Sequence, residues 1–133
     1  MTLDIFNPPQ LGKPSGWNNG LLAPARGRLL FVAGQSASDE TGTVPDIGFL
    51  DQWAKILDKI VAVVRHAGGD PHDIARMTVY VTDRQAYLDN LKPLGNIWRE
   101  RMGKHYPAMA LVEVSALVDE RALVEIEATA VVA

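Results

Sequence analysis

The most regular hydrophobic pattern in the chain lies between residues 46 and 69. Apolar residues recur there at spacings of three and four positions, which is the period of an amphipathic helix. These residues are Leu50, Trp53, Leu57, Ile60 and Val64. Asp46 can accept hydrogen bonds from first-turn amides, and Gly68 with Gly69 supplies a residue that can turn left-handed at the end. The pattern therefore predicts one long helix with both of its boundaries marked.

Shorter segments have the composition or the alternation of β-strands. A short strand is expected at residues 4–6, before a loop rich in proline and glycine. Residues 29–33 form an apolar run bounded by glycines, and residues 74–81 are β-branched or aromatic in their second half. Residues 108–114 and 123–132 alternate apolar with other side chains, and we expect these two strands to be antiparallel neighbours.

The spacing becomes helical again after Asp83. The apolar residues of this stretch are Tyr87, Leu91, Leu94 and Trp98. Pro93 cannot donate an interior hydrogen bond, so we expect a short helix and then a second helix that starts near Pro93. The order of elements predicts one α+β domain over residues 1–133, with a mixed six-stranded sheet and two main helices on one face. The helix-free face is too apolar to stay bare, although Glu125 and Glu127 lie on it, and this favours oligomerisation.

Composition limits the classes of function. Of the 133 residues, 47% are hydrophobic and 22% are charged, which is ordinary for a globular domain. The absence of cysteine excludes disulfides and thiolate metal sites. A formal charge of −3 gives no general positive field, so we expect no nucleic-acid partner. Because no basic-then-apolar leader and no apolar run of roughly 18 residues occurs, we expect a cytoplasmic protein without a membrane partner.

Strong catalytic motifs do not occur in the chain. It has no phosphate-binding glycine loop, dinucleotide fingerprint, zinc-binding helix or nucleophile elbow. The three histidines, His66, His72 and His105, are not spaced as a set of metal ligands, so we expect no metal. Surface or capping roles are the simpler interpretation for all three.

Three glutamates and one tryptophan are candidates for chemistry. If the last two strands pair, carboxylates of Glu113, Glu125 and Glu127 could approach each other, and one could have a raised pKa suited to acid/base work. The alternative is that these carboxylates are solvated or paired at an interface. Trp17 lies in a glycine-flanked loop with no periodic reason for burial, so it could line a pocket, whereas the other two tryptophans fall on helical stripes and are expected in the core.

Several short motifs occur in the order and spacing of a known family. They are Gly34-Gln35, the run from Thr78 to Asp83, Trp98-Arg99-Glu100, Tyr106-Pro107-Ala108, Val112-Glu113-Val114 and the run from Val124 to Ala128. On these motifs nearly the whole chain resembles the RidA/YjgF family, also called reactive intermediate deaminase or, in older labels, endoribonuclease L-PSP. The resemblance implies a chorismate-mutase-like fold and a homotrimer whose sheets form an inner barrel, with ligand clefts between subunits. It also implies hydrolysis of imines and enamines, such as 2-aminoacrylate, to a keto acid and ammonia without a cofactor.

The resemblance assigns roles to particular residues. Glu125 corresponds to the glutamate that organises the attacking water, and Gly34 with Gln35 corresponds to a pair whose backbone contributes to the site. Trp17 falls at the position of a pocket tyrosine. Met109 falls where the family has an arginine that clamps the substrate carboxylate. A methionine cannot make that bidentate charged contact, so the resemblance predicts weak or no activity on 2-aminoacrylate.

The remaining correspondences make the expected cleft more apolar. Leu111 stands at the position of a small or thiol residue, and Gly95 stands at the position of a pocket asparagine. Met109 and Leu111 project from one strand face, which Glu113 continues. We therefore expect a cleft that prefers an apolar or neutral ligand to an amino-acid-like anion. The alternative is that Met109 and Leu111 plug the cleft as interface packing.

Three functions stay open at this point. The first is a cofactor-free deaminase for imines or enamines that lack a carboxylate, or whose carboxylate lies near another cation such as Arg26 or Arg28. The second is a non-catalytic trimer that binds a small ligand or has a regulatory role. The third, a ribonuclease or translation inhibitor, rests only on the older family label, and the acidic net charge argues against it.

Overall fold

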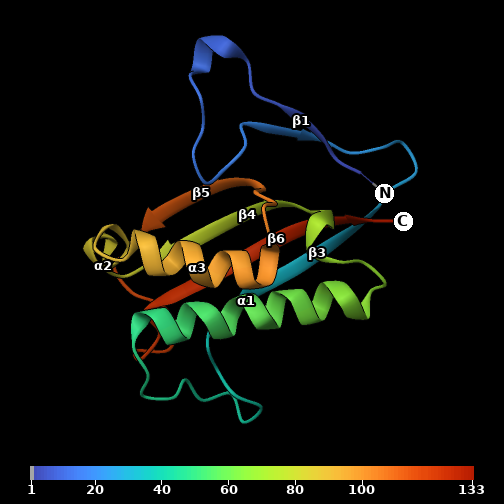
Figure 1. Ribbon diagram of the computed structural model, residues 1–133. Helices are drawn as coiled ribbons and strands as arrows, with labels where there is room; N and C mark the ends of the chain where they lie inside the picture. The colour runs from blue at the N-terminus through green and yellow to red at the C-terminus, as the bar shows by residue number, and fades with distance from the viewer. Residues whose placement is uncertain (1) are drawn as a thin grey trace.

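The computed structural model describes residues 2–133, so of the expected domain Met1 lies outside the described residues. Figure 1 shows a main sheet covered by helices on one side and a hairpin that projects from the body. The strands are β1 (Asp4–Phe6), β2 (Gly20–Leu22), β3 (Arg28–Gln35), β4 (Ile74–Val81), β5 (Ala108–Glu113) and β6 (Val124–Val132). The α-helices are α1 (Phe49–His66), α2 (Arg84–Leu88) and α3 (Leu91–Met102), and short 3-10 turns occur at Pro9–Leu11 and Pro71–Asp73.

The six strands divide between two sheets. The main sheet has the order β3-β6-β4-β5, and β1 pairs only with β2. The predicted α+β class, with helices on one face of a mixed sheet, is confirmed, but the six-stranded sheet is four-stranded and the other two strands form the hairpin. The hairpin strands are only three residues long, and a turn closed by Gly27 N–H donating to the Pro24 carbonyl separates them from β3. Pro24 has a fixed φ and no backbone donor, which interrupts the strand direction at this point.

Strand β6 lies inside the main sheet and is antiparallel to both β3 and β4. Strand β5 pairs parallel with β4. The prediction that the last two strands are neighbours is therefore wrong, because β4 separates β5 from β6. The physical reason is the crossover through α2 and α3, which returns the chain in the same direction and places β5 beside β4.

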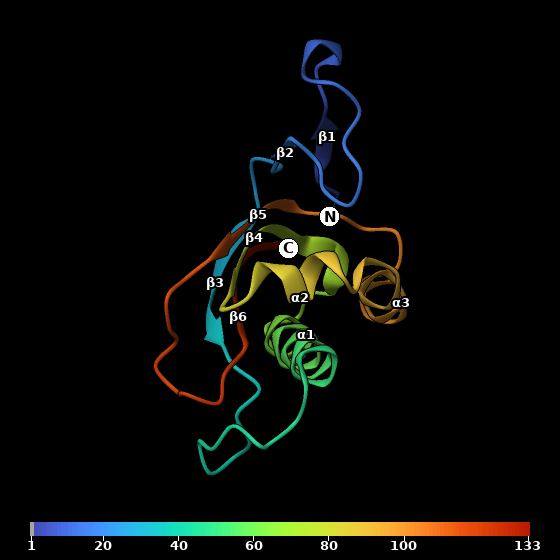
Figure 2. The same cartoon turned by 90° about the vertical axis from the view of Figure 1, so that its left-hand side faces the viewer.

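The hydrophobic core lies between the main sheet and the helices, as Figure 2 shows. On β6 the predicted inward residues Val124, Ile126, Ala128 and Ala130 are all buried. The α1 stripe is also confirmed, with Trp53, Leu57, Ile60 and Val64 buried and Leu50 partly buried against the same core. Helices α2 and α3 are separate, as predicted, and Pro93 lies in the first turn of α3, where it breaks no hydrogen bond.

The ends of α1 differ in how well they were predicted. The N-cap residue is Gly48, without a side-chain hydrogen bond, so Asp46 does not cap the helix. After the C-cap Ala67, Gly68 has φ of 90°, the left-handed conformation expected there. In residues 2–133 no helix is long and apolar enough to cross a membrane.

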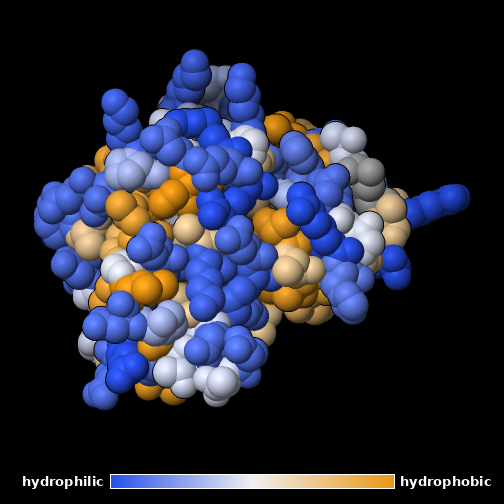
Figure 3. Space-filling model, turned by 60° about the horizontal axis from the view of Figure 1, so that its bottom comes forward, coloured by the Kyte–Doolittle hydropathy of each residue, from blue (hydrophilic) through white to orange (hydrophobic). Residues whose placement is uncertain are grey.

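The two faces of the main sheet differ in their cover. On the helix-covered side, hydrophilic residues form most of the surface and apolar residues appear between them in scattered patches (Figure 3). The opposite face exposes Leu29 and Phe31 of β3 by 62% and 74%. Glu125 and Glu127 of β6 also lie on this face, since their strand neighbours point into the core.

Candidate functional site

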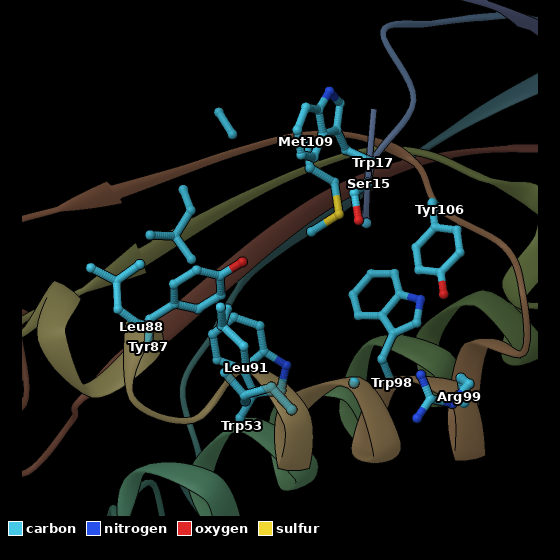
Figure 4. Close-up of a pocket in the computed structure, with 15 residues that line it drawn as sticks. Ser15, Trp17, Trp53, Tyr87, Leu88, Leu91, Trp98, Arg99, Tyr106 and Met109 are labelled. Carbon is cyan, nitrogen blue, oxygen red and sulfur yellow. The ribbon is translucent and has the colours of Figure 1, made fainter. Parts of the chain in front are cut away.

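A pocket of about 580 Å³ opens between β5 and the helices α2 and α3 (Figure 4). Its volume is in the range of small-molecule sites. Aromatic and aliphatic side chains make up most of its wall, among them Trp17, Trp53, Tyr87, Trp98, Tyr106 and Met109. Within the described residues its lining includes no carboxylate and one cation, Arg99. We call this cavity the aromatic pocket.

Two stacked ring pairs stand at opposite ends of the aromatic pocket (Figure 4). Trp53 and Tyr87 have ring centroids 6.0 Å apart at an interplanar angle of 28°. Trp98 and Tyr106 have centroids 6.0 Å apart at an angle of 3°. The Trp98 Nε1–H donates to the His105 carbonyl at 2.9 Å, which fixes the orientation of its ring. These pairs give the pocket flat and rigid walls.

Trp17 reaches the pocket from the loop between β1 and β2. The loop is tied to the start of β5 by Asn18, whose backbone N–H donates to the Pro107 carbonyl at 3.2 Å and whose Nδ2 donates to the Tyr106 carbonyl at 2.7 Å. Asn7 Nδ2 in turn donates to Asn18 Oδ1 at 2.8 Å. The structure thus places Trp17 in the pocket wall, and Asn18 makes both of these hydrogen bonds to the segment before β5.

Met109 and Leu111 project from β5 into the same pocket. They pair in register with the buried Met77 and Val79 of β4, so they lie on the helix-covered face. Glu113 continues this face but lies beyond the pocket. Its Oε1 accepts a hydrogen bond from the Arg84 backbone N–H at 2.9 Å, at the start of α2.

The other expected site residues form a second cluster. A Cβ atom at Gly34 would lie 3.2 Å from Glu125 Cδ, so the two residues are in direct contact across β3 and β6. Gln35 follows Gly34 and its Nε2 donates to the Ala33 carbonyl at 3.0 Å. None of Gly34, Gln35 and Glu125 lines the aromatic pocket. We call these three residues the carboxylate corner.

The expected approach of glutamates from the last two strands is wrong. Glu113 lies on β5, and β4 separates that strand from Glu125 and Glu127 on β6. Glu127 instead accepts a hydrogen bond from the Tyr80 hydroxyl at 3.0 Å, and this bond raises the pKa of Tyr80. Tyr80 also pairs in register with Glu125.

In the part of the chain that the structure describes, no histidine side chain is part of the pocket lining or the carboxylate corner. The ring centroids of His72 and His105 are 5.5 Å apart, and His105 Nε2 lies 2.7 Å from the Ile74 carbonyl oxygen. Burial lowers the pKa of His105. Over residues 2–133 no group of three or more His, Cys, Asp or Glu side chains is arranged to hold a metal ion.

Several pocket residues were not predicted from the sequence: Trp53 and Trp98 were expected only in the core, and Tyr87, Tyr106 and the charged Arg99 were not expected in a site. Arg26 and Arg28 were the expected alternative cations, but neither lines the aromatic pocket. The Arg28 Nε and Nη2 groups donate to the Ala133 carbonyl at 3.1 and 2.8 Å. The available signal was the spacing of four between Gly95 and Arg99, which places a small and a charged residue on one helix face.

The family description "Endoribonuclease L-PSP" matches residues 16–132, a range that includes the carboxylate corner and all of the aromatic pocket's lining except Ser15. The chain belongs to this family. Its RidA/YjgF assignment agrees with two relatives of similar length. A RutC family protein of Pyrococcus abyssi is 33% identical over 105 residues, which is 78% of this chain and 79% of that protein. The Escherichia coli protein named "Putative reactive intermediate deaminase TdcF" is 32% identical over 109 residues, 79% and 80% of the two chains.

Solved structures of RidA/YjgF proteins have the same fold. YyfB of Yersinia pestis, from the conserved Rid protein family, matches with a TM-score of 0.85 and 30% identity over 99% of this chain and 100% of that chain. Escherichia coli TdcF with bound serine matches with a TM-score of 0.69 and 28% identity over 92% of each chain. The family and fold predicted from the sequence motifs are confirmed.

Proposed function

We propose that this RidA/YjgF protein is a cofactor-free hydrolase that deaminates imines or enamines with a bulky apolar body, in a cleft built by two subunits. The observation that carries the proposal is the division of the site. The aromatic pocket offers a binding surface without a carboxylate, and the carboxylate corner offers Glu125 away from that pocket. A homotrimer that sets the corner of one subunit against the pocket of the next supplies both to one ligand.

The helix-free face gives separate support for this assembly. Leu29 and Phe31 expose more than half of their surface there. Large apolar patches on a soluble protein are usually contact surfaces, and closed symmetric assemblies are the common way to cover them. The carboxylate corner lies on the same sheet face, so a subunit that covers Phe31 also comes close to Glu125.

The proposed reaction needs only water and an acid/base group. Water oxygen adds to the carbon of the C=N bond, the C–N bond then breaks, and nitrogen leaves as ammonia while the carbonyl forms. Glu125 carries one proton from the attacking water to the nitrogen during addition, and a second proton from the new hydroxyl group to the nitrogen as the C–N bond breaks. An enamine first takes up a proton on carbon and loses one from nitrogen, which gives the imine that enters this reaction. Gly34 has no side chain, and this leaves space for the Glu125 carboxylate, which a Cβ atom there would approach to 3.3 Å at Oε2.

The walls of the pocket set the proposed substrate range. In this proposal Met109 takes the place of the arginine that clamps small carboxylates in the family. Losing such a charged partner typically costs about 2 to 5 kcal/mol, or roughly 30-fold to several thousandfold in rate. Small anions such as 2-aminoacrylate are therefore poor substrates, whereas larger apolar imines gain contact area against the aromatic rings.

The test compares imines of different size. An amino-acid oxidase forms the imines of leucine and phenylalanine, a dehydratase forms 2-aminoacrylate, and release of ammonia is followed above the spontaneous rate. We expect acceleration with the two larger imines and little with 2-aminoacrylate. Glu125→Gln should lower turnover by about 100-fold or more. Glu120→Gln, on the exposed loop before β6, is the matched control. Unchanged turnover in Glu125→Gln would contradict the proposed role of this carboxylate.

A second function, ligand binding without catalysis, is favoured by one observation. Within the described chain the aromatic pocket is a binding cavity whose lining holds no carboxylate and no histidine. This function predicts that ligands bind but that no imine is hydrolysed faster than in buffer. Glu125→Gln would then change nothing in the assay above.

A further inference from the structure

We infer that Arg99 selects the ligand of the aromatic pocket: it binds the anionic group of a ligand whose apolar body lies against the aromatic walls. The inference rests on the proposed function only in taking this pocket as the substrate site. It names the substrate class, a bulky imine or enamine that carries a carboxylate. It also moves the anion site from Met109 on β5 to Arg99 on α3.

Arg99 differs from its neighbour Arg101 in its electrostatic partners. Arg101 pairs with Asp58 at 2.7 Å and with Glu100 at 3.3 Å. Arg99 donates instead to the uncharged side chain of Asn96, and in the described part of the chain it has no salt bridge. Its positive charge is therefore available to a ligand. Arg99 is an exposed residue that also lines the pocket, and a cation at the mouth of a largely aromatic cavity favours an anion over a neutral group.

Gly95 provides the space in which the guanidinium lies. A Cβ atom at Gly95 would be 3.3 Å from Arg99 Nη1 and 3.9 Å from both Cζ and Nη2. The two residues are four apart on α3, so they share one face of the helix. Glycine inside a helix costs roughly 1 kcal/mol relative to alanine, and such a glycine usually has a packing or functional reason. Here the glycine lets the guanidinium lie against the helix beside the pocket, with Asn96 holding it from one side.

The arrangement of the pocket restricts the shape of the ligand. Figure 4 shows Arg99 on α3 beyond Trp98, with Met109 across the pocket on β5. A ligand that contacts both needs an apolar body between its carboxylate and the part near Met109. A planar guanidinium forms two parallel hydrogen bonds to a carboxylate, and the aromatic rings take a flat body. This revises the expectation, based on Met109 alone, that the cleft prefers neutral ligands.

The test uses two probes of one shape, phenylacetate and its neutral amide, phenylacetamide. All 3 tryptophans of the chain line the pocket, so their fluorescence reports binding directly. We expect phenylacetate to bind about tenfold more tightly than phenylacetamide, as for a charge-assisted hydrogen bond at a partly exposed site. Equal affinities, or no binding of either probe at millimolar concentration, overturn the inference.

Variants assign the preference to Arg99. Arg99→Met should remove the preference for the acid and leave the affinity for the amide within about twofold. Lys104→Met removes the same charge from the exposed turn after α3 and should keep the preference. Gly95→Leu keeps the charge and the helix but fills the space of the guanidinium, and should also lose the preference. A folded Arg99→Met protein that still prefers the acid overturns the inference.

The binding and turnover measurements test the Arg99 inference and the proposed hydrolase separately. Acid preference that depends on Arg99, combined with no hydrolysis of any imine, supports Arg99 and refutes the proposed hydrolase. Hydrolysis of a bulky imine without acid preference in the probe measurements supports the hydrolase and refutes Arg99. Neither result can be mistaken for the other, because fluorescence titration requires no reaction.

Discussion

Each of the two clusters places a charged side chain beside a glycine, but the surroundings are opposite. In the aromatic pocket, Gly95 leaves space for Arg99, with a hypothetical Cβ 3.3 Å from its Nη1. In the carboxylate corner, Gly34 leaves space for Glu125, with a Cβ 3.2 Å from its Cδ. Arg99 borders a concave aromatic cavity, whereas Glu125 lies on the open face of the sheet.

This difference between the two clusters separates the binding cavity from the acid of the proposed reaction. The helix-covered face holds the cavity, and the helix-free face holds the acid that the proposed reaction needs. A β-strand directs alternate side chains to opposite faces, so one sheet cannot bring both into one cleft by itself. In the proposed trimer the helix-free face of one subunit lies near the aromatic pocket of another, so the cavity and the acid meet in one cleft.

The largest effect is expected from a charge on the helix-free face. Phe31→Glu should convert the proposed trimer to monomers, because burying an unpaired carboxylate at an apolar contact costs several kcal/mol. Light scattering coupled to size exclusion measures the mass. Val118→Glu, at a fully exposed loop position, is the control and should stay trimeric. A wild-type protein that is monomeric at micromolar concentration would refute the trimer itself.

A smaller effect should follow when the corner glycine gains a methyl group. Gly34→Ala places a Cβ between 3.2 and 3.4 Å from three Glu125 atoms, so the carboxylate must move. Because misplacing a catalytic group by about 1 Å can cost 100-fold, we expect turnover of a bulky imine to fall by roughly 10- to 100-fold. Affinity for phenylacetate should stay unchanged. A loss of affinity with unchanged turnover would reverse the roles assigned to the two clusters.

The equivalent change in the aromatic pocket, Gly95→Ala, should stabilise the protein. Gly95→Ala should raise the free energy of unfolding by roughly 0.5 to 1 kcal/mol, since alanine is the better residue inside a helix. Nη1 of Arg99 must shift slightly, so the preference for phenylacetate over its amide should weaken. Urea denaturation measures the first effect and the fluorescence titration the second. Destabilisation by this variant would show that Gly95 is required for packing rather than for Arg99.

The smallest expected effect concerns pH and lies outside both clusters. Burial lowers the pKa of His105 from its ordinary value of 6.5, in a setting that also includes His72, Asp70 and Asp73. In the window between that value and the lowered pKa, the unfolded chain binds more protons, so stability should fall as the pH falls through it. His105→Gln should reduce this slope in urea denaturation between pH 7.5 and 5.5. The exposed His66→Gln is the control, and an equal slope in all three proteins would contradict the expectation.

The sequence predicted what depends on local periodicity. The alternation from Val124 to Ala130 indicated which side chains of β6 face the core, and the three-to-four spacing located α1. It could not show that β4 would separate β5 from β6, because strand order depends on pairing between distant segments. For this reason Glu125 was expected near Glu113 as well as near Gly34, and only the second contact forms.

Only part of the candidate site was predicted from the sequence, because the positions of its residues also depend on how distant strands pair. Trp17, Met109 and Leu111 do meet in one pocket, and Gly34 meets Glu125. The division of these residues between two sheet faces follows from register, which the motifs do not encode. The position of Arg99 depends on the direction of a long exposed side chain, which spacing alone does not determine.

Mixed trimers test the divided site most directly. Glu125→Gln removes the acid and Met109→Trp fills the pocket, so each variant alone should be inactive on a bulky imine. If acid and pocket come from different subunits, a random one-to-one mixture has both intact in about a quarter of its clefts. The account predicts recovery of about a quarter of wild-type turnover in the mixture. Activity no higher than that of the separate variants would contradict it, since that is the result for a site contained in one chain.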